Sequence, residues 1–435
     1  MTERSNRPTR RREVSGTTPP EAPVGITRRT LLRNAVGGAA ATVALADAAR
    51  ATDEPIALEG WMTTPGREVG SLAYGMPSRF EADVVRNVTR HTPTRLSAWS
   101  FAPLDRLAGT ITPNGLFFER HHAGIPDIDP EHHRLAVHGL VQRPLVMTME
   151  DIVRLPAVSR VHFLECAGNG YTEVLDMPRS KTVQFSHGLL SCAEWTGVPL
   201  STILEQAGIK REAKWVLAEG ADAAAMARSI PMDHALNDAL VVYAQNGERL
   251  RPEQGYPLRL LVPGCEGNLS IKWLRRLKLG TRPWHTRDET SKYSDLMPDG
   301  TVRQFTLVME AKSVITRPSG GHVLTERGFH EISGLAWSGR GRIQAVEVSV
   351  DGGRHWQPAR LEEPVLAKAL TRFRIGWHWR GGPALLQSRA IDDTGYVQPT
   401  REQLIAVRGT NAEDHFNAVH TWRVGESGEV TNALV

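Results

Sequence analysis

The sequence predicts an α+β protein, in which a mixed α/β domain is followed by an immunoglobulin-like β-sandwich. Residues 116–280 alternate between short strand-like and helix-like segments, whereas from about residue 305 every segment alternates like a strand and ends in a Gly or Asp turn. With 40% hydrophobic and 23% charged residues among 435, the composition suits a soluble globular protein with more than one core. We therefore expect domains at 111–304 and 305–427.

The first domain is expected to mix strands with short helices. RLAVHGLV alternates like a strand, and Thr148, with Asp151 three residues later, forms a capping box that begins a helix. RVHFLE is a second strand, and VPLSTILEQAGI is a helix that ends at Gly208. Further strands are expected at 214–222, 239–250, with an Asn246-Gly247 turn, 257–264 and 271–280.

The second domain shows four strand-like segments between turns: EISGLAWSG, IQAVEVSVDGG, RFRIGWHW and ALLQSRAIDDTG. Their spacing predicts an all-β sandwich of roughly a hundred residues. The tryptophans of this part are more often core residues than ligand platforms, and we expect that of Trp337, Trp356, Trp377 and Trp379.

The N-terminus is identified as a twin-arginine export signal over residues 1–51. Arg28 and Arg29 precede two leucines, a weakly apolar Ala/Gly stretch and A-x-A sites ending at Ala48 and Ala51. The apolar stretch is too short for a membrane anchor. The expected location is the periplasm, and an ordinary basic tail is the alternative. We expect an extended arm with a short helix or two at 52–110, and a tail at 428–435.

The net charge of +4 originates in this N-terminus. Residues 1–51 hold nine arginines and four acidic residues, so the other 384 residues have a net charge of −1. Residues 52–435, with a net charge near zero, offer no global basic field, and no nucleic-acid partner is expected.

The three cysteines, Cys166, Cys192 and Cys265, are widely spaced. No C-x-x-C-H occurs, so no covalently attached c-type haem is expected in this chain. A disulfide between Cys192 and Cys265 is left open. Cys166 ends an apolar run and is followed by AGNG, whose glycines permit close approach of a ligand. A thiolate there would suit a soft or high-valent metal, and a structural buried cysteine is the alternative.

Five ordered motifs make the chain similar to the sulfite oxidase family of molybdopterin enzymes. They are FFERHH at 117–122, CAGN at 166–169, EGAD at 219–222, QGYPLRLLVPG at 254–264 and SIKWL at 270–274. The resemblance covers nearly all of residues 115–425. It implies a molybdopterin-binding domain followed by an Ig-like dimerisation domain, with one Mo-molybdopterin per chain.

The resemblance assigns roles position by position. Cys166 would supply the protein sulfur to molybdenum, beside the two sulfurs of the pterin dithiolene. Arg120 and Arg408 match substrate-facing arginines, and Tyr293 is assigned a catalytic role. The cofactor-binding residues would be Phe118, Arg120, His121, His122, Cys166, Asp222, Gln254, Arg259, Ser270, Ile271 and Lys272. Gln254 stands where the family often has histidine.

Two departures from the family pattern bear on the substrate. Sulfite-oxidising members commonly have CAGNRR, whereas here Gly170 and Tyr171 follow CAGN. Glu289 stands where the family has a tyrosine, and Tyr293 lies four residues on. The loss of an arginine suggests a bulkier or less charged substrate than sulfite. We expect the Gly170–Tyr171 change to open the pocket to a thiol arm.

This pattern looks like the molybdenum subunit of periplasmic sulfane dehydrogenases of Sox thiosulfate oxidation. The implied activity is oxygen-atom transfer from a molybdenum–oxo centre to a sulfane sulfur on a carrier protein, with electrons passed to a c-type cytochrome. The implied assembly is a homodimer, or a heterotetramer with the cytochrome. Sulfite dehydrogenase is the alternative substrate assignment, and a reductase acting on sulfoxides is a third.

Two alternatives lie outside the family. The histidine pairs His121/His122 and His132/His133 suggest a zinc hydrolase, but no H-E-x-x-H occurs, and His132 and His133 are expected to be solvated loop residues. A secreted Ig-like binding protein is the non-enzyme alternative, and it leaves the five ordered motifs without an explanation.

Overall fold

The computed structural model describes residues 59–65, 75–90, 94–170, 181–411 and 414–433. The chain divides into two compact units, residues 1–74 and 75–435. In the first unit the structure describes the short helix α2 (Gly60–Thr63). The predicted export signal at 1–51 lies outside the described residues and stays a prediction. Among the described helices, none has the length and apolar character needed to span a membrane.

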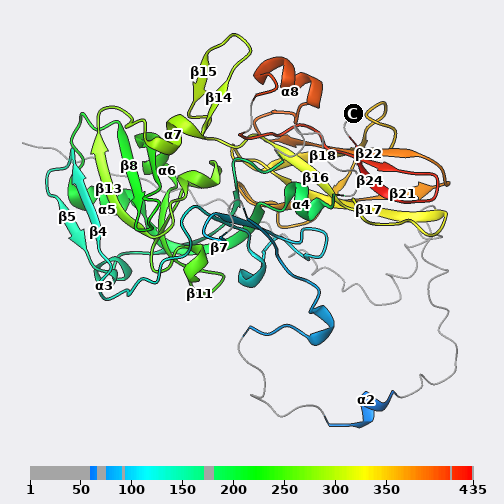
Figure 1. Cartoon of the computed structure of the whole chain (residues 1–435), viewed down its shortest axis with the longest axis horizontal. Helices are drawn as coiled ribbons and strands as arrows, with labels where there is room; N and C mark the ends of the chain where they lie inside the picture. The colour runs from blue at the N-terminus through cyan, green and yellow to red at the C-terminus, as the bar shows by residue number, and fades with distance from the viewer. Residues whose placement is uncertain (1–58, 66–74, 91–93, 171–180, 412–413, 434–435) are drawn as a thin grey trace, which may run out of the picture. The chain divides into compact units, whose positions relative to one another are not determined.

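Two five-stranded sheets form the first part of the second unit (Figure 1). One contains β6 (Val158–Glu165), β7 (Leu190–Pro199), β10 (Leu240–Gln245), β11 (Glu248–Arg249) and β12 (Arg259–Leu261). The other has the order β5 (Leu145–Met147), β4 (Leu135–Gly139), β13 (Leu274–Gly280), β8 (Trp215–Gly220) and β9 (Ala227–Pro231). Only the β13–β4 pair among these is parallel.

Short helices connect these strands, as the sequence predicts. Helix α3 (Met149–Val153) begins with the capping box of Thr148 and Asp151, and α5 (Leu200–Ala207) ends at Gly208. The remaining helices of this part are α4 (Val183–His187), α6 (Met232–Asn237) and α7 (Arg287–Ser291). The apolar face of α5 packs with the second sheet in one buried cluster that includes Leu200, Ile203, Leu204, Leu135 and Leu277.

The predicted arm contains strands that the sequence analysis missed. β1 (Asn87–Arg90) and β2 (Ala98–Phe101) pair with β3 (Glu119–His121) in a three-stranded sheet. Trp99 lies opposite Arg120 in the register. The short strands hide this pairing in the sequence, because neither is long enough to show alternation. The arm thus supports the segment that carries the predicted site residues.

The second part is a β-sandwich of two antiparallel sheets. One contains β16 (Lys312–Arg317), β17 (Gly328–Trp337), β21 (Thr371–Trp379) and β20 (Arg360–Leu361). The other contains β19 (Gln357–Pro358), β18 (Ile343–Ser349), β22 (Ala384–Asp392), β23 (Thr421–Val424) and β24 (Val430–Ala433). β24 pairs with β23, so the sheet continues into the segment expected to be a tail.

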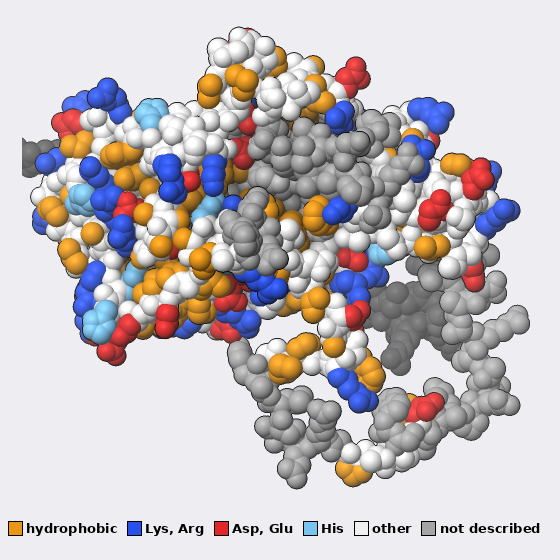
Figure 2. Space-filling view, viewed as in Figure 1, with side chains coloured by type: hydrophobic (Ala, Val, Ile, Leu, Met, Phe, Trp, Pro, Cys, Tyr) orange, Lys and Arg blue, Asp and Glu red, His pale blue; other side chains and the backbone are white. Residues whose placement is uncertain are grey.

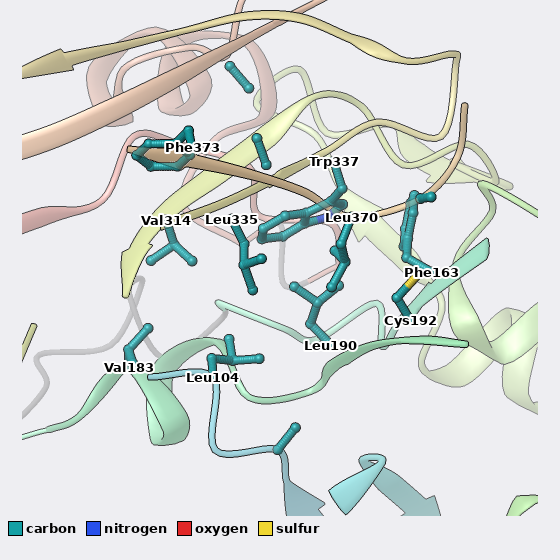
Figure 3. Close-up of a cluster of buried hydrophobic side chains, with 14 of the residues drawn as sticks. Leu104, Phe163, Val183, Leu190, Cys192, Val314, Leu335, Trp337, Leu370 and Phe373 are labelled. Carbon is teal, nitrogen blue, oxygen red and sulfur yellow. The ribbon is translucent and has the colours of Figure 1, made fainter. Parts of the chain in front are cut away.

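One buried cluster joins the sandwich to the first part (Figure 3). Phe163 and Leu190, on β6 and β7, meet Leu335, Trp337 and Leu370 of the sandwich. Trp337 and Trp379 are buried, whereas Trp356 and Trp377 are half-buried. Because the two parts share this apolar core, the end of β6 is held against the sandwich.

A hairpin of β14 (Ser294–Leu296) and β15 (Val302–Gln304) projects beside α8 (Arg401–Arg408), as Figure 1 shows. The hairpin and the end of α8 are in contact, since Gly409 lies against Pro298. On the face in Figure 2, basic and acidic side chains are interspersed, as the small net charge of residues 52–435 leads one to expect.

Candidate active site

A cavity in the first domain gathers most of the predicted site residues. It holds about 710 Å³ of empty space, which includes open solvent at its mouth. Eleven of the thirteen predicted residues line it: Phe118, Arg120, His122, Cys166, Asp222, Gln254, Arg259, Ser270, Ile271, Lys272 and Tyr293. His121 and Arg408 do not. The lining also includes Glu119, Met226, Asn268 and Trp273, which the sequence analysis did not assign to the site.

Cys166 lies in a tight turn directly after β6. Its amide donates to the carbonyl of Leu189 over 3.0 Å, and the Asn169 amide donates to the Cys166 carbonyl over 2.9 Å. Gly267 packs against this turn, because a Cβ there would lie 2.7 Å from the Glu165 carbonyl oxygen. The sequence thus places the thiol at the end of a buried strand, with a glycine allowing the opposite loop to come close.

The thiol of Cys166 lies in a setting that favours its protonated form unless a metal binds. Burial raises its pKa to about 11, and the positive charge of Arg120 opposes this rise. A metal that coordinates a thiol removes its proton outright. The side chain is therefore inert as a free nucleophile and suited to be a soft ligand.

Arg120 is fixed by the predicted arm. Its guanidinium stacks 4.8 Å from the centre of the Trp99 ring and donates to the Ser97 hydroxyl over 3.4 Å. It also donates to the carbonyl of His121. Trp99 and Ser97 are functional neighbours that the sequence did not reveal, because the pairing of β2 with β3 brings them to the site.

The other end of the cavity contains two buried basic side chains, Arg259 and Lys272. Burial lowers the pKa of Arg259 to about 9. Lys272 donates to the carbonyls of Arg120 and Glu253, and its pKa falls well below the ordinary value because of burial and the charge of Arg259. Nε of Arg259 has no partner. A bound anion would give this nitrogen an acceptor and would stabilise the positive charges of both side chains.

Gln254 positions Arg259. Its side-chain oxygen accepts from Arg259 over 3.1 Å, and its side-chain amide donates to the carbonyl of Phe118 over 3.0 Å. Oδ1 of Asp222, which also lines the cavity, is buried without a partner. It offers an acceptor for N–H groups of a heterocyclic ligand.

The two histidines of FFERHH differ in position. His122 lines the cavity, whereas His121 lies beneath it, where its Nδ1 accepts from Lys272 over 3.0 Å and its Nε2 donates to Glu119 over 2.8 Å. Burial lowers the pKa of each to about 3, so both rings are neutral at ordinary pH. His121 therefore supports Lys272 from below the cavity.

Tyr293 lines the cavity, as predicted, and Glu289 does not. The Tyr293 ring lies 4.7 Å from the Arg228 guanidinium, and burial, followed by the nearby Cys166, raises the pKa of its hydroxyl. Glu289 is buried in α7, where its carboxylate accepts from Ser229 and from the Thr286 amide. Glu289 is thus a structural capping residue, and Tyr293 is the tyrosine at the site.

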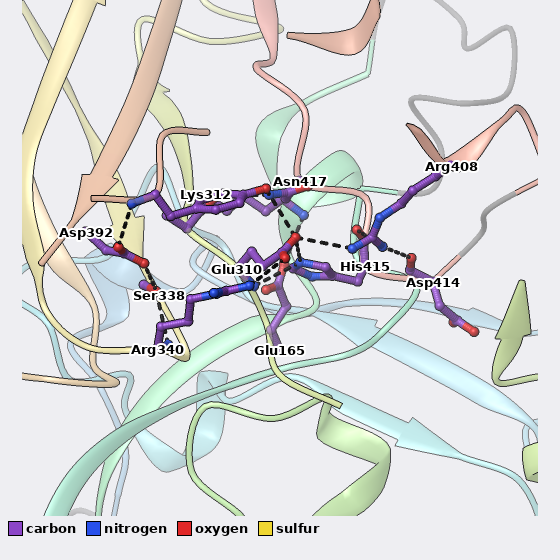
Figure 4. Close-up of polar contacts among 12 residues, drawn as sticks. Glu165, Glu310, Lys312, Ser338, Arg340, Asp392, Arg408, Asp414, His415 and Asn417 are labelled. Atoms are coloured by element: carbon purple, nitrogen blue, oxygen red, sulfur yellow. Dashed lines mark hydrogen bonds and ion pairs between the residues drawn. The ribbon is translucent and has the colours of Figure 1, made fainter. Parts of the chain in front are cut away.

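Arg408 lies at the end of α8, outside the cavity lining. Its guanidinium donates to Glu310 over 3.2 Å and to the carbonyls of Asp414 and His415 (Figure 4). Burial acts to raise the pKa of Glu310, but the hydrogen bond to His415 and the charge of Arg408 outweigh it and lower that pKa to about 2. The structure thus pairs Arg408 within the sandwich, and its role toward substrate stays a prediction.

Gly170 has a structural role that differs from the predicted opening of the pocket. The space beside it is taken by the ammonium group of Lys312, 2.9 Å from where a Cβ would lie. The missing side chain makes room for Lys312, and Gly170 is not among the residues that line the cavity. Tyr171 lies outside the described residues.

Of the two histidines that were expected to be solvated, His132 is exposed and His133 is not. His132 is exposed and paired with Asp129, as expected. His133 is buried and bonds to the Leu274 carbonyl over 2.8 Å, so the expectation that it is solvated was wrong; burial against β13 is the reason. Across the described residues, no three or more His, Cys, Asp or Glu side chains gather as a metal site. Cys192 and Cys265 are both free and buried.

Comparisons with known proteins agree on one family. Residues 122–287 match the oxidoreductase molybdopterin binding domain, and residues 303–421 match the Mo-co oxidoreductase dimerisation domain. The chain is 33% identical to mitochondrial sulfite oxidase of Mus musculus over 67% of its own length and 58% of the relative. It is 32% identical to sulfite oxidase of Gallus gallus over 66% of its length and 68% of the relative. The chain thus spans little more than half of the mouse protein.

A solved structure is similar over almost its whole length. The chain is 46% identical to a chain of the sulfane dehydrogenase SoxCD from Paracoccus pantotrophus, with a TM-score of 0.84. The match covers 87% of this chain and 97% of that one.

The cavity fits the molybdopterin that these domains bind. The unpartnered nitrogen of Arg259, with Lys272 beside it, suits the pterin phosphate, and the unpartnered oxygen of Asp222 suits pterin N–H groups. Cys166 lines the same cavity and would be the protein sulfur ligand. With few protein donors gathered there, the other metal ligands would come from the cofactor.

Proposed function

The chain belongs to the sulfite oxidase family of molybdopterin-binding oxidoreductases, and we propose that it is the molybdenum subunit of a periplasmic sulfane dehydrogenase. One observation carries the enzyme assignment: a single cavity joins a thiol end, with Cys166, Arg120 and Tyr293, to a cationic end, with Arg259 and Lys272. The sulfane assignment is supported by the 46% identity to the SoxCD chain, against 33% to the mouse sulfite oxidase.

Each residue at the thiol end has a defined task. Molybdenum bound to the pterin would supply the two-electron oxidation of sulfur with transfer of an oxygen atom. Cys166 would hold the metal. Arg120, fixed by Trp99 and Ser97, would stabilise the negative charge that develops on the substrate oxygens. Tyr293 stays protonated because its pKa is raised, so its hydroxyl can donate to a substrate oxygen.

The cationic end would bind and orient the cofactor. Arg259, aligned by Gln254, and Lys272, aligned by His121, would hold the phosphate. Asp222 would accept hydrogen bonds from the pterin ring, and Ser270 and Ile271 would line its path. The partner at each cation fixes its direction, so little conformational entropy is lost when the cofactor binds.

The remaining assignments extend the proposal beyond the chain itself. We propose export by the twin-arginine route, a homodimer formed through the sandwich or a heterotetramer with a cytochrome, electron transfer to that c-type cytochrome, and a carrier protein that presents the sulfane. The dimerisation-domain match at 303–421 supports self-association.

Cytochrome c reduction by the native enzyme tests the proposed substrate. Equal concentrations of free sulfite and of carrier-bound sulfane would be compared, with Arg120→Gln as the variant that weakens charge stabilisation. A clear preference for the carrier-bound sulfane supports the proposal. A preference for free sulfite would identify the chain as a sulfite dehydrogenase instead. That alternative is suggested by the mouse relative, a sulfite oxidase that is 33% identical to the chain.

A further inference from the structure

A lysine of the β-sandwich is buried against the turn that carries Cys166. Lys312 begins β16, and 1% of its side chain is exposed. Its ammonium group donates to Glu165 Oε1 over 2.9 Å and to the Asn169 carbonyl oxygen over 2.8 Å. Glu165 and Asn169 flank the turn, so one cation from the second domain ties its two ends together.

The carboxylate of Glu165 is fully buried and receives donors from both domains. The indole N–H of Trp337, on β17, donates to Oε2 over 2.7 Å, and the side-chain amide of Asn169 donates to Oε1 over 2.9 Å. A buried ion pair brings a desolvation cost that packed apolar side chains would avoid. The benefit of this pair therefore lies in holding the turn in one conformation, because all of these hydrogen bonds converge on the carboxylate of Glu165.

Gly170 shows that the turn is built around this lysine. Its φ is +87°, and a Cβ would lie 2.9 Å from Lys312 Nζ and 3.3 Å from the Phe416 carbonyl oxygen. A side chain at 170 would therefore displace either the ammonium group or the segment that carries Phe416. The sandwich also contacts the turn through its main chain, since the His415 amide donates to the Ala167 carbonyl over 2.7 Å.

We propose that Lys312 is a positioning residue for Cys166. Through Glu165 and the carbonyl of Asn169, it holds the turn so that the thiolate sulfur keeps a fixed place in the cavity. The β-sandwich thereby completes the metal site in addition to its place in dimerisation. This inference rests on the proposed function only for the identity of the metal that Cys166 binds.

The test compares variants of the native molybdenum-loaded enzyme. Lys312→Met removes the cation, and Lys368→Met is the matched control, because its ammonium group forms another ion pair between the two domains, with Asp238 and not with Glu165 or Asn169. The measurements are the Mo(V) electron paramagnetic resonance spectrum after chemical reduction, molybdenum per chain, kcat and KM. We expect Lys312→Met to shift the spectrum and lower kcat by about 10- to 100-fold with KM little changed, because a small displacement of a reacting group has that effect.

Three results would overturn the inference. The first is a Lys312→Met enzyme with a lower melting temperature but the wild-type spectrum and kcat, because that result would show that Lys312 only stabilises the fold. The second is an equal spectral shift in Lys368→Met. The third concerns the double variant Glu165→Gln/Lys312→Met, which leaves no buried unpaired charge and can be used if the single variant does not fold. A wild-type spectrum in this double variant would show that Lys312 does not position Cys166.

The two proposals can fail separately. Chemical reduction needs no sulfur substrate, so the spectral comparison stands even where the enzyme oxidises no carrier-bound sulfane. In that case the proposed substrate is wrong and the positioning role of Lys312 is still measured.

Discussion

The two ends of the cavity are built in opposite ways. At the thiol end, the turn of Cys166 is closed by a buried pair, Glu165 and Lys312, whose polar groups find partners within the protein. At the cationic end, Arg259 and Asp222 keep buried polar atoms without a partner, and burial, followed by the charge of Arg259, lowers the pKa of Lys272. The polar groups of the buried pair at the thiol end are satisfied by the protein, whereas those at the cationic end need a bound ligand to be satisfied.

This difference separates stability from function. Removing one member of a buried pair whose groups satisfy one another destabilises the folded chain whether or not a cofactor is bound. Groups left unsatisfied destabilise the empty protein and gain energy when an anion enters. Substitutions at the thiol end should therefore lower the free energy of unfolding of the apoprotein, and substitutions at the cationic end should lower cofactor retention instead.

Glu165→Leu is expected to have the largest effect on stability. It leaves the ammonium group of Lys312 buried and unpaired, which costs about 3–5 kcal/mol of the free energy of unfolding. Denaturant unfolding of the apoprotein measures this loss. The exposed pair Glu150–Arg154 is the control, and Glu150→Leu should cost less than about 0.5 kcal/mol. Equal losses in the two variants would show that Lys312 does not depend on Glu165 as its buried charge partner.

Gly170→Ala is expected to cost about 2–3 kcal/mol, since it combines a left-handed backbone with the crowding of Lys312 and Phe416. Gly395→Ala separates the two causes. Its φ of +84° is similar, but no atom lies within 4 Å of the added Cβ, so only the backbone cost of about 1 kcal/mol should appear. A Gly170→Ala loss no greater than that of Gly395→Ala would show that the turn can accommodate a side chain.

Acidification should weaken the apoprotein through His121. Its pKa is about 3 in the folded chain against an ordinary 6.5, so the unfolded chain binds the proton first and stability falls as the pH drops below 6.5. The loss attributable to His121 between pH 7 and pH 5 should be about 1–2 kcal/mol. Unfolding curves of His121→Gln at the two pH values should differ by that much less than those of wild type, and an unchanged pH dependence would contradict the neutral state of His121.

Lys272→Met is expected to have the smallest effect on the apoprotein, because the loss of its hydrogen bonds to Arg120, His121 and Glu253 is offset by the removal of a buried cation that Arg259 repels. Its effect should appear in the holoenzyme. Loss of one charge-assisted hydrogen bond to a phosphate lowers affinity by about 10- to 100-fold. Molybdenum and pterin per chain measure this, with the exposed Lys210→Met as control. Full cofactor content in Lys272→Met would remove the anion-binding role.

The residues of the cationic end were predicted through the resemblance to the sulfite oxidase family, because each of them lies within a short motif. Arg259 follows Gln254 by five positions in one motif, and Lys272 is the third residue of SIKWL. The supports of these residues could not be predicted. Trp99 reaches Arg120 only through the pairing of two short strands, and Lys312 reaches Gly170 across 142 positions.

Arg408 and Glu289 show a second limit of the sequence. A motif indicates which residue types are present but not how their charges are shared. Arg408 pairs with Glu310 of its own domain, and Glu289 caps α7, so neither lines the cavity. The secondary structure of the two main domains was predictable from alternation and capping, whereas the arm sheet depended on contacts that no local pattern encodes.

X-ray absorption at the molybdenum edge, on wild type and on Cys166→Ser, tests the role of Cys166 most directly. We expect three sulfur neighbours of the metal in wild type, one from Cys166 and two from the pterin, and two in the variant. The same sulfur count in both proteins, or no molybdenum in fully matured wild type, would contradict the assignment of Cys166 as the metal ligand.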